Sequence, residues 1–316
     1  MLKYIFSFIV LITSLSSIAQ KKHTNKADMD SLKQGGDMEK PTSYVRISAG
    51  VGNQLLSLSN KALNAQQVSN KVVFTPSLGY YHKSGFGISA TGYLLSDSTT
   101  SGLYQTALTP SYEYDGDNLS SGISYTRYIV KNKYGGAIAP IQNDIYANLL
   151  FKKPWLRPGV AIGISNGVYK EINLVTVNLP GIGLRSFIDT ATTKTNAFTL
   201  IGMLEHTFEM GGLMSADDYL SFTPAIMLNA GSSKVVTTHQ NRFTPNVQDN
   251  KRKFRGGTGQ PDVIPFGIQS IGANFNFAYS IGKFTFEPQL YLDYYLHDSD
   301  TNKFTQVYNI VFAFMF

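Results

Sequence analysis

Cysteine is absent from this sequence, and charged residues are scarce. With no Cys among 316 residues, the chain has no disulfide, no thiolate metal site and no Cys for lipid attachment. Charged residues account for 15% of the chain, against roughly 25% in ordinary soluble domains. Long apolar runs are also missing after the N-terminal segment, which excludes a bundle of membrane-spanning helices. The formal net charge of +6 is mild and spread out, so it indicates no nucleic-acid partner.

The N-terminal segment has the pattern of a secretory signal. Lys3 gives it a positive start, residues 4–12 form a short apolar core, and small residues lead to a predicted cleavage after Ala19. An uncleaved anchor is the alternative, but the apolar run is too short to span a bilayer. The sequence thus divides into a signal peptide at 1–19, a polar flexible leader at 20–43 that is a tether or a partner-binding tail, and a β-rich region at 44–316.

Aromatic residues are plentiful in the β-rich region, at 13% of the whole chain, and they recur with a period of two. In residues 304–316, every second position from Tyr308 to Phe316 is large and apolar, and the positions between are smaller or polar. Such alternation predicts a β-strand with one strongly apolar face. Twelve segments of similar length are predicted as strands: 44–52, 72–81, 86–95, 103–114, 119–129, 144–152, 159–169, 198–208, 219–230, 268–281, 284–297 and 304–316.

The second face of these segments decides between a soluble sheet and a membrane barrel. A soluble sandwich places Lys, Glu and Thr on its wet face. Here that face is mostly Ser, Gly, Thr, Asn and Ala, which fits a lipid-facing apolar exterior around a small polar interior. The charged residues within the twelve segments are Arg46, Glu113, Arg127, Asp144, Lys152, Glu205, Glu287 and Asp293.

The gaps between the predicted strands are unequal. Counted from the N-terminus, the odd-numbered gaps hold 6 to 37 residues and the even-numbered gaps hold 2 to 10. Short periplasmic turns and long outer loops are typical of outer-membrane barrels, and a closed ring leaves no strand edge in the hydrocarbon. The sequence therefore predicts an all-β fold, a single transmembrane antiparallel up-and-down β-barrel of about twelve strands.

A short motif recurs along the chain, as F-T-P-S-L-G-Y at 74–80, L-T-P-S-Y-E-Y at 108–114, F-T-P-A-I at 222–226 and F-E-P-Q-L at 286–290. Each proline falls on the predicted lipid-facing side, where a β-bulge is one way to accommodate it. With the signal pattern and the terminal Phe316, the chain resembles outer-membrane β-barrel proteins of the Bacteroidota type. This resemblance implies the architecture and the outer membrane of a Gram-negative bacterium, and it leaves the function open.

Charged residues at inward positions are the candidates for a functional lumen. They either line a constriction that selects a permeant by its charge or form ion pairs that fill a narrow interior. A barrel of this size is much narrower than the large porins, which favours ion pairs. The candidates are Arg46, Glu113, Lys152, Glu205 and Glu287 toward the periplasmic end, and Asp144, Asp293 and His297 toward the outer end.

Two predicted outer loops are unusual in composition. The loop at 231–267 contains a basic cluster that suits lipopolysaccharide phosphates or an acidic ligand, or is simply solvated. The loop at 170–197 contains an apolar stretch, 172–184, that either extends the strands, plugs the mouth or contacts a partner protein. The basic cluster consists of Lys251, Arg252, Lys253 and Arg255.

Catalytic patterns are weak. Some outer-membrane lipid-modifying enzymes have a His and a Ser two residues apart, as His82 and Ser84 are, but Gly85 stands where an Asn is expected. The five His residues lack metal-ligand spacing, and no glycine motif precedes a helix. We therefore expect no enzyme, no metal and no cofactor.

The leading functional hypothesis is a passive channel or binding barrel for a small solute. The alternative is a non-conducting accessory or structural subunit of a larger outer-membrane complex. A lipid-modifying enzyme is a remote third hypothesis. Expected partners are outer-membrane lipid and lipopolysaccharide, the barrel-assembly machinery and another outer-membrane protein. The assembly machinery is expected to read the terminal aromatic residues Phe312, Phe314 and Phe316.

Overall fold

The computed structural model describes residues 43–54, 72–95, 102–130, 141–179, 183–215, 218–243, 262–296 and 303–316. The signal peptide and all but the last residue of the leader lie outside these ranges. The described part contains no helix long and apolar enough to cross a membrane.

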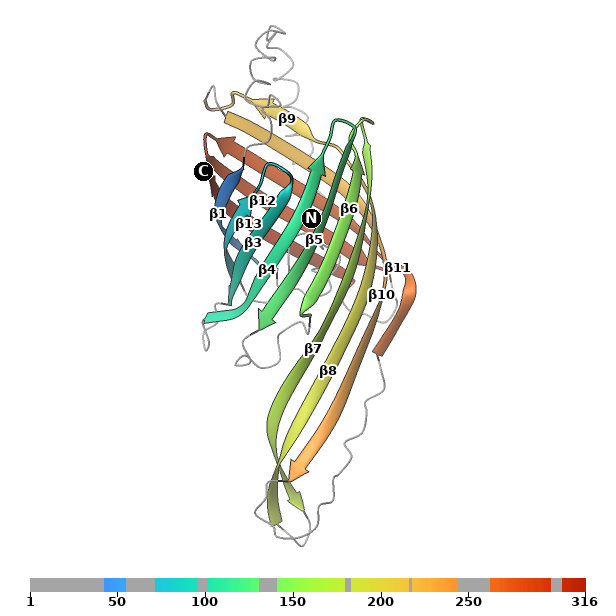
Figure 1. Ribbon diagram of the computed structural model, residues 1–316. Coiled ribbons are helices and arrows are strands. Elements are labelled where there is room, and N and C mark those ends of the chain that lie inside the picture. Colours follow the sequence, from blue (N-terminus) through green and yellow to red (C-terminus); the bar gives the residue numbers. More distant parts are fainter. Residues whose placement is uncertain are drawn as a thin grey trace, which may run out of the picture. The chain divides into compact units, whose positions relative to one another are not determined.

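Thirteen β-strands make up the regular structure of the described residues (Figure 1). Their bounds are β1 (Tyr44–Gly52), β2 (Val73–Tyr81), β3 (Phe86–Leu95), β4 (Gly102–Asp115), β5 (Leu119–Val130), β6 (Asn143–Phe151), β7 (Arg157–Leu179), β8 (Gly183–Glu205), β9 (Phe208–Gly211), β10 (Asp218–Phe243), β11 (Asp262–Ile281), β12 (Phe284–Tyr295) and β13 (Phe304–Met315).

The strands form one closed antiparallel ring. Each strand from β1 to β8 pairs with the next, β8 pairs with β10, β10 with β11, and so on to β13, which pairs with β1. The short β9 is a continuation of β8, because both pair with β10 on either side of the contact in which His206 N–H donates to the carbonyl of Pro224. With β8 and β9 counted as one, the ring has twelve strands, which confirms the predicted barrel.

The two ends of the barrel differ. Short connections join β2 to β3, β4 to β5, β6 to β7, β9 to β10 and β11 to β12, and all of them lie at one end, here named the short-turn end. The opposite end, the loop end, carries the longer connections and the tight connection between β7 and β8. The first strand begins and the last strand finishes at the short-turn end, where Val45 and Phe316 exchange two backbone hydrogen bonds.

The outward face is apolar around the ring. On β13, Tyr308, Ile310, Phe312 and Phe314 are exposed, and the residues between them are buried against the interior. Branched aliphatic residues continue this face over the middle of the other strands, and exposed aromatic rings gather toward both ends. An apolar belt with aromatic girdles is the surface that a bilayer covers, so the architecture is that of an outer-membrane β-barrel. Exposed rings at the short-turn end include Tyr44, Phe86, Tyr112, Phe151, Trp155, Phe208 and Phe284, and those toward the loop end include Phe74, Tyr125, Phe266, Tyr294 and Phe304.

Two predicted loops were wrong in their extent. The predicted loop at 170–197 is mostly strand, because β7 and β8 each run for 23 residues and meet in a hairpin. The predicted loop at 231–267 is also partly strand, because β10 reaches Phe243 and β11 begins at Asp262. In its described residues the stretch at 172–184 extends the strands, which is the first of the three alternatives. The basic cluster at 251–255 lies outside the described residues.

The extended strands project beyond the barrel as a narrow sheet, here named the fin, which comprises β7 beyond Val168, β8 before Asn196 and β10 beyond Lys234 (Figure 1). Strand β6 pairs with β7 only as far as Asn166, so the rest of β7 has no strand partner on that side among the described residues. From Tyr169 to Leu179 the fin rises about 35 Å along the strand at roughly 3.3 Å per residue.

The motif prolines are accommodated by gaps in the hydrogen-bond ladder and not by bulges. Between β2 and β3, Phe74 pairs with Leu94 and the next pair is Ser77 with Thr91, so the ladder skips Pro76 without a change of register. The β4–β5 and β11–β12 ladders skip a motif proline in the same way. Because proline has no N–H to donate, the ladder loses two pairs there and then resumes.

Candidate functional site

The predicted lumen charges at the short-turn end form ion pairs. Arg46 Nη2 on β1 lies 2.6 Å from Glu287 Oε2 on β12, and both side chains are partly buried. The bond crosses over β13, whose Ala313 is fully buried between the two strands. Arg46 and Glu287 are thus partners in one ion pair in this structure.

Glu205 is also paired, with a residue that sequence reasoning missed. Arg157 Nη2 lies 2.9 Å from Glu205 Oε1 across the β7–β8 ladder. The same nitrogen contacts the hydroxyl of Thr207, which in turn contacts the hydroxyl of Thr223 at 2.8 Å. Arg157 was missed because the predicted strand began at residue 159, which left the arginine in a turn.

The remaining charges of this end lie at the rim. Lys152 Nζ lies 2.8 Å from Asp115 Oδ1, and the Asp115 side chain is largely exposed. Glu113 is exposed at the end of β4, so it is not part of an enclosed lumen. The predicted lumen residue His297 lies outside the described residues.

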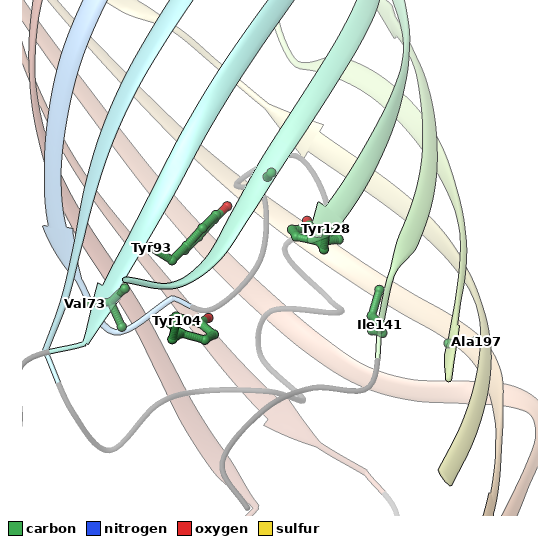
Figure 2. Close-up of a cluster of buried hydrophobic side chains, with 7 residues drawn as sticks. Val73, Tyr93, Tyr104, Tyr128, Ile141 and Ala197 are labelled. Carbon is green, nitrogen blue, oxygen red and sulfur yellow. The ribbon is translucent and has the colours of Figure 1, made fainter. Parts of the chain in front are cut away.

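A row of tyrosines occupies the interior toward the loop end and is here named the tyrosine wall. It consists of Tyr93 on β3, Tyr104 on β4 and Tyr128 on β5, all fully buried. The ring centres of Tyr93 and Tyr104 lie 6.2 Å apart in an edge-to-face arrangement, and those of Tyr93 and Tyr128 lie 6.5 Å apart. Figure 2 shows the three side chains gathered inside the barrel, with Val73 and Ile141 beside them.

Buried side chains from several strands line the interior at this level. Ala197 from β8 belongs to the same buried cluster as the tyrosine wall, and Ile141 is also a member of that cluster (Figure 2). A second buried cluster contains Ile201 and Met227, from β8 and β10, and Tyr291 and Val307, from β12 and β13.

The opposite side of the ring carries a hydrogen-bonded polar group centred on Asn229. Its amide nitrogen lies 2.8 Å from Ser270 Oγ, 2.6 Å from the Tyr291 hydroxyl and 3.1 Å from Asp293 Oδ1. The Tyr291 hydroxyl also donates to Asp293 Oδ1 at 2.8 Å. All four residues are buried, and they come from β10, β11 and β12. The predicted lumen residue Asp293 therefore lies inside the barrel, among neutral donors.

Gly272 makes room for this group. It lies on β11 directly opposite Asp293, and a Cβ atom added to it would collide with the phenol of Tyr291. The tyrosine ring therefore lies flat over the glycine, which places its hydroxyl beside the carboxylate.

Several amide groups on this side lack hydrogen-bond partners among the described residues. They are the side-chain oxygens of Asn229 and Asn276 and both amide atoms of Asn309. Asn229 and Asn309 are buried, and the three residues lie on β10, β11 and β13. Buried polar groups are normally satisfied, so this part of the interior, here named the amide wall, is suited to an occupant that supplies the missing bonds.

Asp144, another of the candidate lumen residues, lies inside the barrel near the loop end. Its Oδ1 accepts a hydrogen bond of 2.6 Å from Ser165 Oγ on β7, and the aspartate is buried. With Asp293, it gives the loop-end half of the interior two carboxylates on separate walls.

The arrangement can bind but has no evident reacting pair among the described residues. Within them, no group of three or more His, Asp or Glu side chains is placed to hold a metal ion. His82 and Ser84 do contact each other, because His82 Nδ1 lies 2.9 Å from Ser84 Oγ and accepts the Ser84 N–H at 3.2 Å. Both residues are exposed in the turn between β2 and β3, where these bonds close the turn.

Comparison with known proteins gives only distant likenesses. No protein-family model and no curated protein matches the sequence. A bacterial polysaccharide outer-membrane secretin is 9% identical with a TM-score of 0.35, and the match covers 88% of this chain and 99% of that chain. LpxR from Salmonella typhimurium is 10% identical with a TM-score of 0.32, and the match covers 86% of this chain and 100% of that chain. A chain of the RagAB peptide transporter is 9% identical with a TM-score of 0.36, and this chain spans 44% of its length. Likenesses this weak carry no argument about function, so the site must be judged from its own residues.

Proposed function

We propose that this protein is an outer-membrane barrel that takes a small polar solute into a narrow lumen, as a restricted channel or a binding barrel. The observation that carries the proposal is the pair of facing surfaces toward the loop end. The tyrosine wall on β3 to β5 is separated in the ring from the amide wall on β10 to β13 by several strands on either side. Aromatic faces opposite amide donors and acceptors suit a solute that has both apolar and hydroxyl or amide surfaces.

The charge of the interior narrows the solute class. Asp144 and Asp293 lie in the loop-end half, and the arginines Arg46 and Arg157 are neutralised by their glutamate partners at the short-turn end. An anionic solute would meet carboxylates before any free cation among the described residues. We therefore assign a neutral or cationic solute.

Conductance of the purified full-length protein in a planar bilayer tests the proposal. The wild type is expected to show a small conductance, because buried side chains fill the lumen. Replacing Tyr93, Tyr104 and Tyr128 together with alanine is expected to raise the conductance several-fold, whereas the matched triple phenylalanine variant keeps the rings and the small conductance. The proposal would be overturned if the wild type and both triple variants fold but show no conductance.

One observation favours a non-conducting accessory subunit as the second candidate. The outward face of the fin exposes Ile172, Leu174, Leu184 and Ile188 well above the last apolar residues of the barrel wall. Apolar side chains above the bilayer are suited to a partner protein. Two results together would support this second function. The purified protein would show no conductance in planar bilayers, and a defined larger complex in the native membrane would be lost when Leu174 and Ile188 are changed to serine.

The location and biogenesis belong to the same proposal. The signal pattern at 1–19 supports export, and the barrel architecture supports the outer membrane of a Gram-negative bacterium, with the short-turn end in the periplasm. The recurring proline motif supports membership of the barrels of the Bacteroidota type. Phe312, Phe314 and Phe316 are all exposed on the outward face, where the assembly machinery can read them.

A further inference from the structure

Three exposed lysines lie where the fin leaves the barrel. They are Lys170 on β7, Lys194 on β8 and Lys234 on β10. Their neighbours along each strand, Tyr169, Thr195 and Val235, are less exposed, so the lysines occupy the same face as the lipid-facing residues.

The strand register brings the three lysines together. Lys170 pairs with Thr192, and Lys194 pairs with Val168, so Lys170 and Lys194 are diagonal neighbours on one face. Lys194 also pairs with Val236 and Lys234 with Asn196, which makes Lys194 and Lys234 diagonal neighbours as well. Diagonal neighbours on one face of a sheet lie about 7–8 Å apart.

This face offers the ammonium groups no acidic partner in the described part of the chain. The residues paired directly with the lysines are Thr192, Val168, Val236, Asn196 and Val263, and all of them are uncharged. The ion pairs found within the described ranges involve other residues. Three like charges at this spacing repel one another, and a multivalent anion bound between them would remove the repulsion.

The position of the lysines relative to the apolar belt indicates which anion fits. On β7 the outward residues run from Ile162 and Ile164 through Asn166 and Val168 to Lys170. Strands β8 and β10 show the same order, with Asn196 before Lys194 and Ser232 before Lys234 on the way out of the barrel. On all three strands a polar residue thus precedes the lysine, and the lysines lie at the outer edge of the apolar belt.

A chain of polar contacts crosses the neighbouring strands nearer the barrel, at Asn166. Arg127 Nη1 on β5 donates to Asn143 Oδ1 at 2.6 Å, and Asn143 Nδ2 donates to Asn166 Oδ1 at 2.8 Å. Arg127 is exposed on the outward face and has no carboxylate in these contacts. The guanidinium is therefore held in the row of Asn166, four residues nearer the barrel than Lys170, and it is not part of the lysine cluster.

We propose that Lys170, Lys194 and Lys234 form a binding site for the phosphate groups of lipopolysaccharide. The site faces the membrane and not the lumen, so its ligand is a phosphorylated glycolipid whose acyl chains lie against the apolar belt below. Ammonium groups bind phosphate as charge-assisted donors, and each basic residue near an anionic surface adds to the attraction. The site is independent of what enters the lumen.

Binding of purified rough lipopolysaccharide to the detergent-solubilised full-length barrel tests the site. The variant in which Lys170, Lys194 and Lys234 are all glutamine is expected to bind at least about tenfold more weakly than the wild type. High salt is expected to reduce the wild-type affinity toward that of the variant, because exposed charges are screened. A change in electrophoretic mobility on boiling checks that each variant is folded.

The matched control removes the same charge at the short-turn end. Lys83, Lys153 and Lys283 are exposed in its turns, and their triple glutamine variant should bind lipopolysaccharide as the wild type does. Dephosphorylated lipopolysaccharide should bind poorly, and inorganic phosphate should not compete at millimolar concentration. Equal binding by the two triple variants, or equal binding of the dephosphorylated lipid, would overturn the site. Effective competition by inorganic phosphate would overturn the assignment to a lipid.

Discussion

Single residues fix the connections at the short-turn end, and Asp218 shows how. Its carboxylate accepts the N–H groups of Leu213 at 2.7 Å, Met214 at 2.6 Å and Ser215 at 3.1 Å, and the hydroxyl of Tyr279 at 2.8 Å. Burial alone would raise the pKa of this carboxyl, but the hydrogen bonds from Met214, Tyr279, Leu213 and Ser215 outweigh it and lower the pKa to about 2. The charged form therefore holds the turn between β9 and β10.

The depressed pKa of Asp218 gives a pH prediction. A group whose pKa is lowered by folding stabilises the folded state above its unfolded pKa, and this stabilisation is lost as the pH falls through the folded pKa. The turn is therefore expected to stay closed down to about pH 4 and to open between about pH 4 and pH 2. Limited proteolysis after residue 212 across this range measures the opening. Asp218→Asn should be cleaved at neutral pH as well, and equal resistance of the two proteins would contradict the prediction.

Gly272 is the residue on which the polar group around Asn229 depends. Changing Gly272 to alanine places a Cβ against the phenol of Tyr291, and overpacking of this kind costs about 1–3 kcal/mol of stability. The melting temperature of the purified barrel measures the loss. Because the clash requires both partners, the double change with Tyr291→Ala should cost less than the sum of the single changes.

The control for Gly272 is another glycine in a strand. Gly202 on β8 has open space where a Cβ would be added, so its change to alanine should leave the melting temperature nearly unchanged. Additive losses for Gly272→Ala and Tyr291→Ala would show that the ring does not rest on the glycine.

At the level of elements, sequence patterns located the strands and misjudged the length of four. The period-two alternation reflects one lipid-facing side, so it identified a strand in every wall of the ring. The alternation did not show where β7, β8, β10 and β11 extend beyond the barrel. In β7 and β8 the reason is that the sequence at 172–184, outside the barrel, is as apolar as the barrel strands. A strand length set by bilayer thickness then ended β7 and β10 too early and began β8 and β11 too late.

The candidate site was predictable only in part. Arg46, Glu287, Asp144 and Asp293 were found because charges at inward positions are rare. The tyrosine wall was not found, because Tyr93, Tyr104 and Tyr128 come from three strands whose mutual register no local pattern reveals. The amide wall was missed for the same reason, since Asn and Thr are ordinary residues for the inner face of a barrel.

The fin is expected to be dispensable for the barrel. On the short-turn side of Val168, β7 is paired with β6 and β8, and β8 is paired with β10. The ring therefore does not need the projecting part of the hairpin. Replacing residues 171–191 with Asn-Gly leaves Lys170 paired with Thr192 next to a two-residue turn of a favoured type. The shortened protein should insert and show the same change in electrophoretic mobility on boiling as the wild type. Loss of that change would mean that the fin guides or stabilises the ring.

For the whole molecule, closure depends on one seam, between β1 and β13, and the Arg46–Glu287 pair crosses it. Changing Arg46 to glutamate places two carboxylates together and should lower the rate and yield of the folded barrel during refolding in detergent. Exchanging the charges, with Arg46→Glu and Glu287→Arg in one chain, should restore much of both. A swapped variant as impaired as the single change would show that the two positions do not act as a pair.

This pair links residues 241 positions apart in the chain, and it joins β1 to β12 across the strand that lies between them. Such a bond cannot form in an open sheet, because its two partners meet only when the ring is complete. The ion pair therefore stabilises the closed ring, which forms in the final step of assembly. Its formation separates a finished barrel from an open intermediate that has all its other strands in place.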